Sequence, residues 1–104
     1  MIEYKVIKEI EKKADHTQRS LAVQLDVSLG KINYILAGFM KIGAIQAKKV
    51  RDHHDKIRWR YYLTPKGMQE KLRLARLYYN LLSGEYDALK RDLEKSGEIA
   101  EAGK

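Results

Sequence analysis

The spacing of apolar residues changes within residues 17–63, and this change limits the folds available to the chain. Up to Gly43 the apolar residues recur at the spacing of an α-helix. Beyond Gly43, residues 45–50 and 57–63 alternate between apolar and polar side chains, as β-strands do. A polar, charged loop at residues 51–56 joins these two segments. The pattern therefore predicts helices followed by one β-hairpin.

Three helices are expected before the hairpin. The first covers residues 2–14 and ends at residues 15–16. Thr17 and Ser28 are residue types that cap helix N-termini well, so they mark the starts of the second and third helices. Gly43 ends the third helix, because glycine adopts the left-handed conformation that follows many helices. The side chains expected to face the core from the first and third helices are Ile2, Val6, Ile7, Ile10, Ile32, Ile35, Leu36, Phe39 and Ile42.

The second and third helices carry the pattern of a helix-turn-helix. Ala22 provides the small side chain that lets the two helices approach each other. Asp26 lies in the turn, and aspartate tolerates a left-handed conformation better than most residues. Thr64-Pro65 is a typical helix start, and a long helical pattern then runs to about Lys95. The order of elements predicts a mainly α fold with a small β-hairpin, a winged helix-turn-helix with a long C-terminal helix.

The excess positive charge lies in one part of the chain. Residues 28–66 hold nine Lys or Arg and two Asp, a net charge of +7 that equals the formal net charge of the whole protein. The charges of residues 1–27 cancel, and so do those of residues 67–104. A positive charge confined to a helix and a hairpin is typical of a surface that binds nucleic-acid phosphates.

The polar face of the third helix offers groups that can read DNA bases. Asn33 can pair with adenine through two hydrogen bonds, and Lys31 suits either guanine or a phosphate. Tyr34 can contact a thymine methyl group or a phosphate, and Gly30 lets the helix N-terminus approach a duplex closely. A solvated face of a helical hairpin is the alternative interpretation. The basic hairpin that follows favours DNA.

The hairpin is expected to form a cationic wing. Alternation sends Trp59, Tyr61 and Leu63 toward the core. A single cationic ribbon is expected on the other side, made of Lys48, Lys49, Arg51, Lys56, Arg58, Arg60 and Tyr62. A charged edge that only prevents aggregation is the alternative. Phosphate contacts are predicted from the start of the second helix, the end of the third and the wing: Thr17, Gln18, Arg19, Lys41, Lys48, Lys49, Arg51, His53, His54, Lys56, Arg58 and Arg60.

Two stretches of the sequence resemble one known family. They are Thr17 to Ile45, TQRSLAVQLDVSLGKINYILAGFMKIGAI, and Tyr61 to Gly67, YYLTPKG. Through them the chain resembles the MarR-type winged-helix regulators, and most specifically the small subgroup associated with exopolysaccharide gene clusters. The resemblance covers most of residues 3–95.

The resemblance implies a dimeric, sequence-specific transcriptional regulator, usually a repressor, that binds palindromic double-stranded DNA. It implies a wing over residues 51–58 and base reading by Ser28, Gly30, Lys31, Asn33 and Tyr34. Typical family members also have a further N-terminal helix, which helps to build the dimer and an effector pocket. This sequence starts at the first helix of the motif, so a small-molecule effector is possible but unsupported.

The C-terminal helix carries an apolar seam that indicates dimerisation. Its members recur at alternating intervals of three and four residues, as in coiled coils: Leu72, Ala75, Tyr79, Leu82, Tyr86, Leu89 and Leu93. A helix reaching about Lys95 is roughly 40 Å long at 1.5 Å per residue, too long for one small domain to cover. A second copy can cover it, so a homodimer is expected. The expected segments are a winged helix-turn-helix domain at residues 1–66, a dimerisation helix at residues 67–96 and a flexible tail at residues 97–104.

Other chemistry has little support in the sequence. His53-His54-Asp55 has no partner set of His or Cys elsewhere, so no metal site is expected. The sequence has no cysteine, no nucleophile–base set and no glycine-rich phosphate loop, so neither an enzyme nor a cofactor is expected. No apolar run is long enough to span a membrane, and the first residues lack the core of a signal peptide, so a cytoplasmic protein is the simplest interpretation. The alternative function is a winged-helix protein-interaction module whose long helix binds a heterologous partner.

Overall fold

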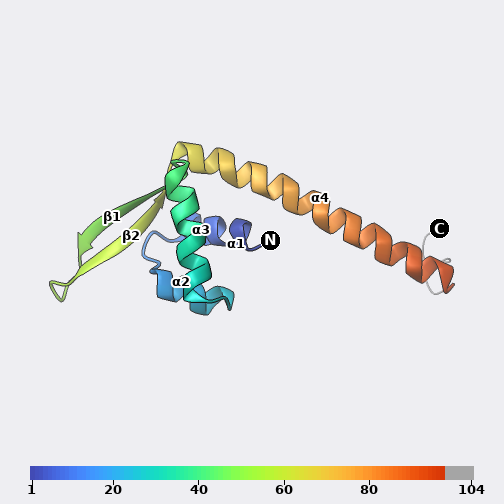
Figure 1. The fold of residues 1–104 in the computed structure, drawn as a ribbon, viewed down its shortest axis with the longest axis horizontal. Coiled ribbons are helices and arrows are strands. Elements are labelled where there is room, and N and C mark those ends of the chain that lie inside the picture. Colours follow the sequence, from blue (N-terminus) through green and yellow to red (C-terminus); the bar gives the residue numbers. More distant parts are fainter. Residues whose placement is uncertain (98–104) are drawn as a thin grey trace. The chain divides into compact units, whose positions relative to one another are not determined.

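The computed structural model describes residues 1–97 and confirms the predicted winged helix-turn-helix (Figure 1). The elements in chain order are α1 (Ile2–Lys12), α2 (Gln18–Leu25), α3 (Leu29–Lys41), β1 (Ile45–Arg51), β2 (Ile57–Leu63) and α4 (Pro65–Lys95). The chain divides into two compact units, Met1–Leu74 and Ala75–Lys104, so α4 begins in the first unit and continues into the second. Apart from Gly97, the predicted tail at residues 97–104 lies outside the described residues.

The core of the first unit forms where α1, α2, α3 and the hairpin meet. Its largest fully buried side chains come from all three helices: Val6, Ile7, Leu21, Ile32 and Leu36. Removing one such side chain from water contributes about 1.5–3 kcal/mol. This cluster therefore fixes α3 against α1 and α2, and it determines which face of α3 remains exposed.

The prediction that Ile42 faces the core is wrong, because this side chain is 41% exposed. Ile42 is the C-cap residue of α3, with a backbone φ of −87° and ψ of 1°. The chain has left the helix at this point, so helical spacing no longer sets the direction of the side chain. Gly43 follows with a φ of 77°, the left-handed conformation that was predicted for it.

Both predicted N-caps and the predicted turn are confirmed. Thr17 Oγ1 accepts a hydrogen bond from the backbone N–H of Ser20 at 3.0 Å, and Ser28 Oγ accepts one from that of Lys31 at 3.1 Å. Asp26 adopts the left-handed conformation, with a φ of 55° and a ψ of 49°. This residue ends α2 and turns the chain into α3 within a short connection.

The strands β1 and β2 form a two-stranded antiparallel sheet, and residues 45–63 are called the wing below. In its register Ala47 pairs with Tyr61, Lys48 with Arg60 and Ile45 with Leu63. Directly opposed residues of two strands share one face of a sheet. Tyr61 is 4% exposed and belongs to the core, so its face of the wing is the one that joins the core.

The junction between β2 and α4 explains the T-P-K-G sequence. Thr64 Oγ1 caps α4 by accepting a hydrogen bond from Gly67 N–H at 3.0 Å, and its hydroxyl group donates to the Gly43 carbonyl oxygen at 2.6 Å. Gly67 is buried, and a Cβ there would lie 2.1 Å from the Ala44 carbonyl oxygen and 2.5 Å from Leu63 Cδ1. Only glycine therefore lets α4 pass this close to the base of the wing.

Helix α4 is continuous over 31 residues and runs without a break through Ser83 and Gly84. Its buried residues, Gly67 and Leu74, both belong to the first unit. From Ala75 to Lys95 every side chain of α4 is exposed or half-buried. The second unit thus has no core of its own within its described part.

Candidate nucleic-acid interface

The predicted base-reading residues of α3 lie on its exposed face. Lys31 and Asn33 are exposed, and Tyr34 is 81% exposed. Gly30 is exposed as well, and a Cβ added to it would have no neighbour within 4 Å. Packing within the chain therefore does not require glycine at this position. Lys41 lies exposed in the last turn of the helix.

Ser28 is exposed, and its side chain serves the start of α3. The oxygen accepts the backbone N–H of Lys31, while the hydroxyl hydrogen can still donate to an acceptor outside the protein. This residue therefore fixes the first turn of the helix that carries the other predicted base-reading residues.

The N-terminus of α2 lies beside α3 and the wing. Arg19 is exposed there, and its phosphate contact stays a prediction. Gln18 is half-buried, and its side-chain amide bonds to Asn33 of α3 and to Tyr61 of β2, each at 3.2 Å. These two partners are 15 and 43 positions away in sequence. Sequence reasoning had no signal for them and placed Gln18 among the phosphate contacts.

The cations of the wing lie on two faces, so the prediction of a single cationic ribbon is wrong. The register puts Lys49 and Arg51 on the face of Tyr61. The opposite face carries the other strand residues of the predicted ribbon: Lys48, Arg58, Arg60 and Tyr62. The physical reason is the pleat of a strand, in which successive side chains point in opposite directions. Adjacent Lys48 and Lys49 therefore cannot share a face.

The prediction that Trp59 packs on the core is also wrong, because its side chain is 49% exposed. Alternation correctly puts Trp59 on the face of Tyr61. The core extends only as far as Tyr61, however, and the wing continues past it (Figure 1). Lys49 Nζ lies 5.3 Å from the centre of the Trp59 ring, within the range of a cation–π interaction. This part of the wing is thus both aromatic and cationic.

A hollow of about 420 Å³ lies between the wing and the starts of α2 and α3. Its lining combines predicted phosphate contacts with apolar side chains: Thr17, Gln18, Arg19, Leu29, Ile57, Arg58, Trp59 and Tyr61. The hollow adjoins the N-terminus of α2, whose backbone N–H groups favour anions. Two cationic side chains, Arg19 and Arg58, thus share this hollow with four apolar or aromatic ones.

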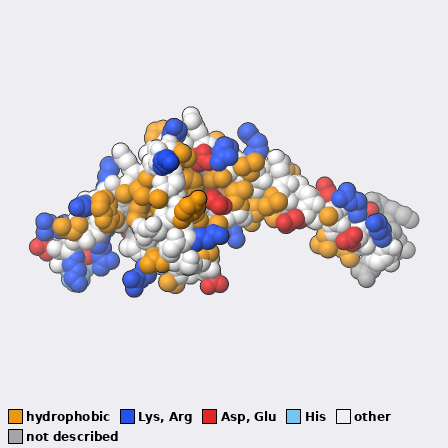
Figure 2. All heavy atoms as spheres, viewed as in Figure 1, with side chains coloured by type: hydrophobic (Ala, Val, Ile, Leu, Met, Phe, Trp, Pro, Cys, Tyr) orange, Lys and Arg blue, Asp and Glu red, His pale blue; other side chains and the backbone are white. Residues whose placement is uncertain are grey.

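Asp52 organises the tip of the wing, where Lys and Arg side chains gather (Figure 2). Its carboxylate accepts hydrogen bonds from the backbone N–H groups of Lys56 and His54, each at 2.9 Å, and from Arg58 Nε at 2.7 Å. The bond from Lys56 contributes most to keeping the pKa of Asp52 below its ordinary value of 3.8, against a smaller opposing effect of desolvation. Arg58 therefore meets a phosphate only with its charge partly neutralised.

The other residues of the wing loop are exposed. Arg51 pairs with Asp55 at 3.1 Å, and the rings of His53 and His54 lie with their centres 4.1 Å apart. Within residues 1–97, no group of three or more His, Cys, Asp or Glu side chains gathers in a way that could hold a metal ion.

A buried histidine, His16, lies behind the interface, and its role was not predicted from the sequence. His16 is 6% exposed, with Nδ1 at 3.0 Å from Ser20 Oγ and Nε2 at 3.3 Å from a carboxylate oxygen of Glu9. The same carboxylate oxygen accepts a hydrogen bond from Gln24 Nε2 at 2.9 Å. These contacts tie α1 to both ends of α2 and so hold the N-terminus of α2 in place.

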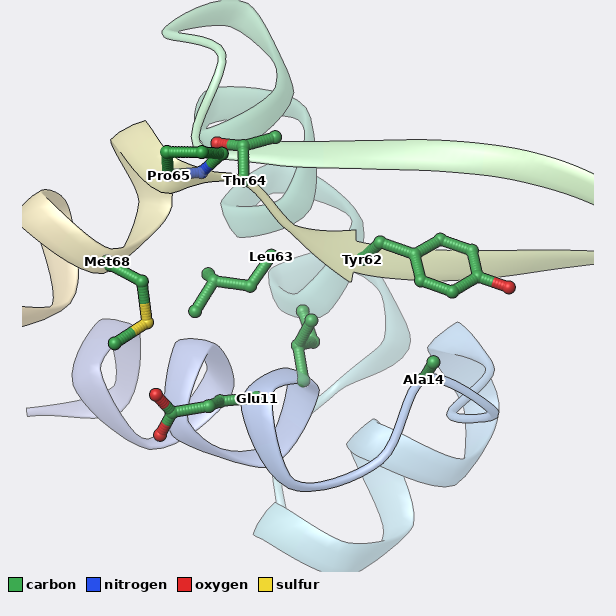
Figure 3. Close-up of a pocket in the computed structure, with 8 residues that line it drawn as sticks. Glu11, Ala14, Tyr62, Leu63, Thr64, Pro65 and Met68 are labelled. Atoms are coloured by element: carbon green, nitrogen blue, oxygen red, sulfur yellow. The ribbon is translucent and has the colours of Figure 1, made fainter.

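A second hollow, of about 630 Å³, lies between the end of α1 and the junction of β2 with α4 (Figure 3). Leu63 and Met68 reach from this junction toward α1. Glu11 is its charged lining residue, and the Glu11 carboxylate forms an ion pair with Lys71. No basic side chain lines this hollow, so it does not extend the cationic surface.

The predicted dimer seam of α4 is largely exposed in the single chain. Its most exposed members are Tyr79 at 72%, Tyr86 at 66%, Leu72 at 61% and Leu89 at 60%. Leu82 is 46% exposed, and Ala75 and Leu93 are half-buried. Most of this apolar row is thus open to solvent in the single chain. No helix among the described residues is long and apolar enough to cross a membrane.

Comparisons with known proteins agree with this fold. Residues 2–46 match the winged helix-turn-helix DNA-binding family. No curated protein matches the chain in sequence.

Several solved structures are similar over most of the chain. A Streptococcus transcriptional regulator is 20% identical with a TM-score of 0.66, over 86% of this chain and 91% of that one. BldR from Sulfolobus solfataricus is 20% identical with a TM-score of 0.66, and the match covers 97% of this chain and 73% of BldR. FabT from Streptococcus pneumoniae, in complex with DNA, is 22% identical with a TM-score of 0.54, and the match covers 98% of this chain and 76% of FabT. At these identities the likeness concerns the fold. Fold and site together define a winged helix-turn-helix protein with a basic wing and a polar exposed face on α3.

Proposed function

We propose that this protein is a sequence-specific, DNA-binding transcriptional regulator that acts as a homodimer, most simply as a repressor. The observation that carries the proposal is where the charge lies. The segment with a net charge of +7, residues 28–66, contains both the exposed face of α3 and the wing. These two surfaces belong to one compact unit, so they can contact one duplex together.

The proposed division of labour follows from the chemistry of the exposed groups. Lys31, Asn33 and Tyr34 carry donors and acceptors on one helix face, which suits base edges in a major groove. Phosphate contacts from Arg19, Lys49 and the other wing cations supply affinity without sequence preference. The hollow beside the N-terminus of α2 supports this arrangement, because it lies between the two sets.

The homodimer is proposed from the exposed seam on α4. At 1.5 Å per residue, the 31 residues of α4 span about 46 Å. Its apolar row continues to Leu93, and a second copy would cover this row by matching it with its own. Two copies related by a two-fold axis would present two α3 helices about one DNA turn apart, so the proposed operator is a palindrome.

Repression and the exopolysaccharide-associated subgroup are proposed from the sequence motifs alone. The motifs that carry this resemblance are Q-R-x-L-A and S-L-G-K-x-N-Y in the helix-turn-helix and L-T-P-K-G at the start of α4.

A second candidate function is a protein-interaction module in which α4 binds a different protein. The observation in its favour is that Leu77 and Leu81, which lie off the seam, are 44% and 52% exposed. The apolar surface of α4 is therefore wider than one coiled-coil seam requires. The polar and cationic face of α3 favours the DNA-binding function over this one.

Selection of binding sites from random duplex DNA at moderate salt tests the proposed function. We expect an enriched palindrome with half-site centres about ten base pairs apart. The matched controls are Asn33→Ala, expected to flatten the sequence preference, and Lys49→Ala, expected to weaken binding to all sequences alike. If no sequence is enriched and binding is only salt-sensitive, specific recognition by α3 is refuted and α4 becomes the surface to probe for protein partners.

A further inference from the structure

A chain of hydrogen bonds connects the core to the exposed face of α3. Tyr61, on β2, is 4% exposed, and its hydroxyl oxygen accepts a hydrogen bond from Gln18 Nε2 at 3.2 Å. Gln18 Oε1 in turn accepts a hydrogen bond from Asn33 Nδ2 at 3.2 Å. The three residues come from β2, α2 and α3. One end of the chain is thus anchored in the core, and the other is the exposed amide of Asn33.

This arrangement leaves a defined set of groups free on Asn33. A primary amide has two N–H donors and one carbonyl acceptor. Gln18 engages one of the donors, so one N–H and the carbonyl oxygen of Asn33 remain available. That pair of groups matches the N7 acceptor and the N6 amino donor of adenine in the major groove.

We propose that Gln18 is a positioning residue for base recognition, which orients the amide of Asn33 and is itself held by Tyr61. The proposal rests on the proposed function. It assigns Gln18 a role in specificity in place of the phosphate contact that the sequence predicted.

The burial of each member supports this role. Tyr61 is rigid because its ring packs in the core and its strand is paired, with Ala47 opposite. Gln18 is half-buried and is the first residue of α2, whose start is fixed by the capping box of Thr17 and Ser20. An exposed asparagine without such support rotates freely and loses entropy when it binds a base. A preoriented amide avoids this loss, so the chain of bonds raises discrimination at one base pair.

The first test uses the free protein and needs no DNA. The side-chain amide resonances of Asn33 are followed by NMR in Gln18→Met and Tyr61→Phe, with Arg19→Gln and Tyr62→Phe as controls. Tyr62 is adjacent to Tyr61 but lies on the opposite face of β2. We expect both test variants to shift and mobilise the Asn33 amide, although Tyr61 does not bond to it directly. Unfolding temperatures close to that of the unaltered protein show that each variant is folded. An Asn33 amide unchanged in both test variants overturns the proposal, whatever the protein binds.

The second test uses the DNA sequence that the unaltered protein selects. We expect Gln18→Met to lower discrimination about fivefold, the effect of one lost hydrogen bond, at the base pair where Asn33→Ala acts. The double variant should lose no more than Asn33→Ala alone, and Arg19→Gln should lower affinity for specific and random DNA equally. A Gln18→Met variant that weakens all sequences alike refutes the positioning role and restores the phosphate contact. If the unaltered protein selects no sequence, the proposed function fails instead, and the NMR result still decides whether the bonds exist.

Discussion

Replacing Gly67 with alanine should destabilise the fold, because the space for a side chain is already filled. A Cβ at this position would lie 2.1 Å from the Ala44 carbonyl oxygen, 2.5 Å from Leu63 Cδ1 and 3.0 Å from Leu63 Cγ. The nearest of these atoms belongs to the backbone, so no rotation of a side chain relieves the clash. Either α4 or the base of the wing has to move.

The expected loss of stability is the balance of two effects. Forcing an extra methyl group into a packed site costs about 1–3 kcal/mol, and a backbone clash belongs at the upper end. Alanine favours the helix over glycine by about 1 kcal/mol. The net loss of unfolding free energy is therefore about 2 kcal/mol. For a small domain this corresponds to a fall of roughly 8–16 °C in melting temperature.

The measurement is thermal unfolding followed by circular dichroism, at one protein concentration because the proposed dimerisation would make the melting temperature concentration-dependent. Gly38→Ala and Gly84→Ala are matched controls, since a Cβ at either position meets nothing within 4 Å. Both should melt at or above the unaltered protein, because only the helix preference changes. If Gly67→Ala melts as high as these controls, the packing explanation of the T-P-K-G sequence is wrong.

Three further predictions concern the oligomer, the salt dependence and the wing tip. Replacing Leu82 and Leu89 together with lysine should give monomers that bind DNA poorly; a dimer in sedimentation would place the interface elsewhere. With roughly six to eight phosphates neutralised per dimer, log affinity should fall with log salt at a slope near −6, and Lys49→Ala should make this slope shallower while Asn33→Ala leaves it unchanged. The native contacts hold the pKa of Asp52 below 3.8, so its carboxylate should order the wing tip at pH values above 3.8. The wing tip should lose this order as the pH falls through the lowered pKa. Backbone amide shifts of the wing tip should therefore follow a titration with a midpoint below 3.8. A midpoint at or above 3.8 would contradict the hydrogen bonds assigned to this residue.

The local features of the fold could be predicted from the sequence because each depends on a few adjacent residues. Thr17 and Ser28 cap their helices, and Asp26 takes the left-handed conformation, because these side chains satisfy or tolerate a backbone requirement at their own position. The alternation of β2 likewise identified the faces of Tyr61 and Trp59 correctly.

Features that depend on how far the core extends along the wing could not be predicted from local sequence. Alternation states which face a residue occupies, but not whether anything covers that face. Tyr61 is buried and Trp59 is half exposed on the same side of one strand, since the core ends between them. Lys48 and Lys49 are adjacent on one strand, so alternation alone puts them on opposite faces. Only the pairing across the hairpin decides that Lys49, and not Lys48, shares the face of Tyr61.

Contacts between elements that are distant in the chain could not be predicted from the sequence, for a different reason. The bonds of Gln18 join three elements, and those of His16 join α1 to α2. Each residue type has many ordinary roles on a surface, and nothing in its neighbours in the chain marks the partner. For the candidate site, the exposed face of α3 followed from helical spacing, whereas the groups that orient it required the tertiary structure.

The two-sided charge of the wing bears on how many of its cations can act on one duplex. A phosphate backbone seated in the hollow beside α2 would meet the face of Tyr61, which carries Lys49 and Arg51. Lys48 and Arg60 lie on the opposite face of the wing. Arg58 lines the hollow but is bound to Asp52, and Arg51 is paired with Asp55. A duplex that meets only the face of Tyr61 would therefore engage about half of the wing cations of each protomer. With Arg19, this leaves about three or four phosphates for each protomer, in line with a salt slope near −6 for the dimer. A much steeper slope would mean that both faces of the wing engage DNA, as they would if the wing were inserted into a minor groove.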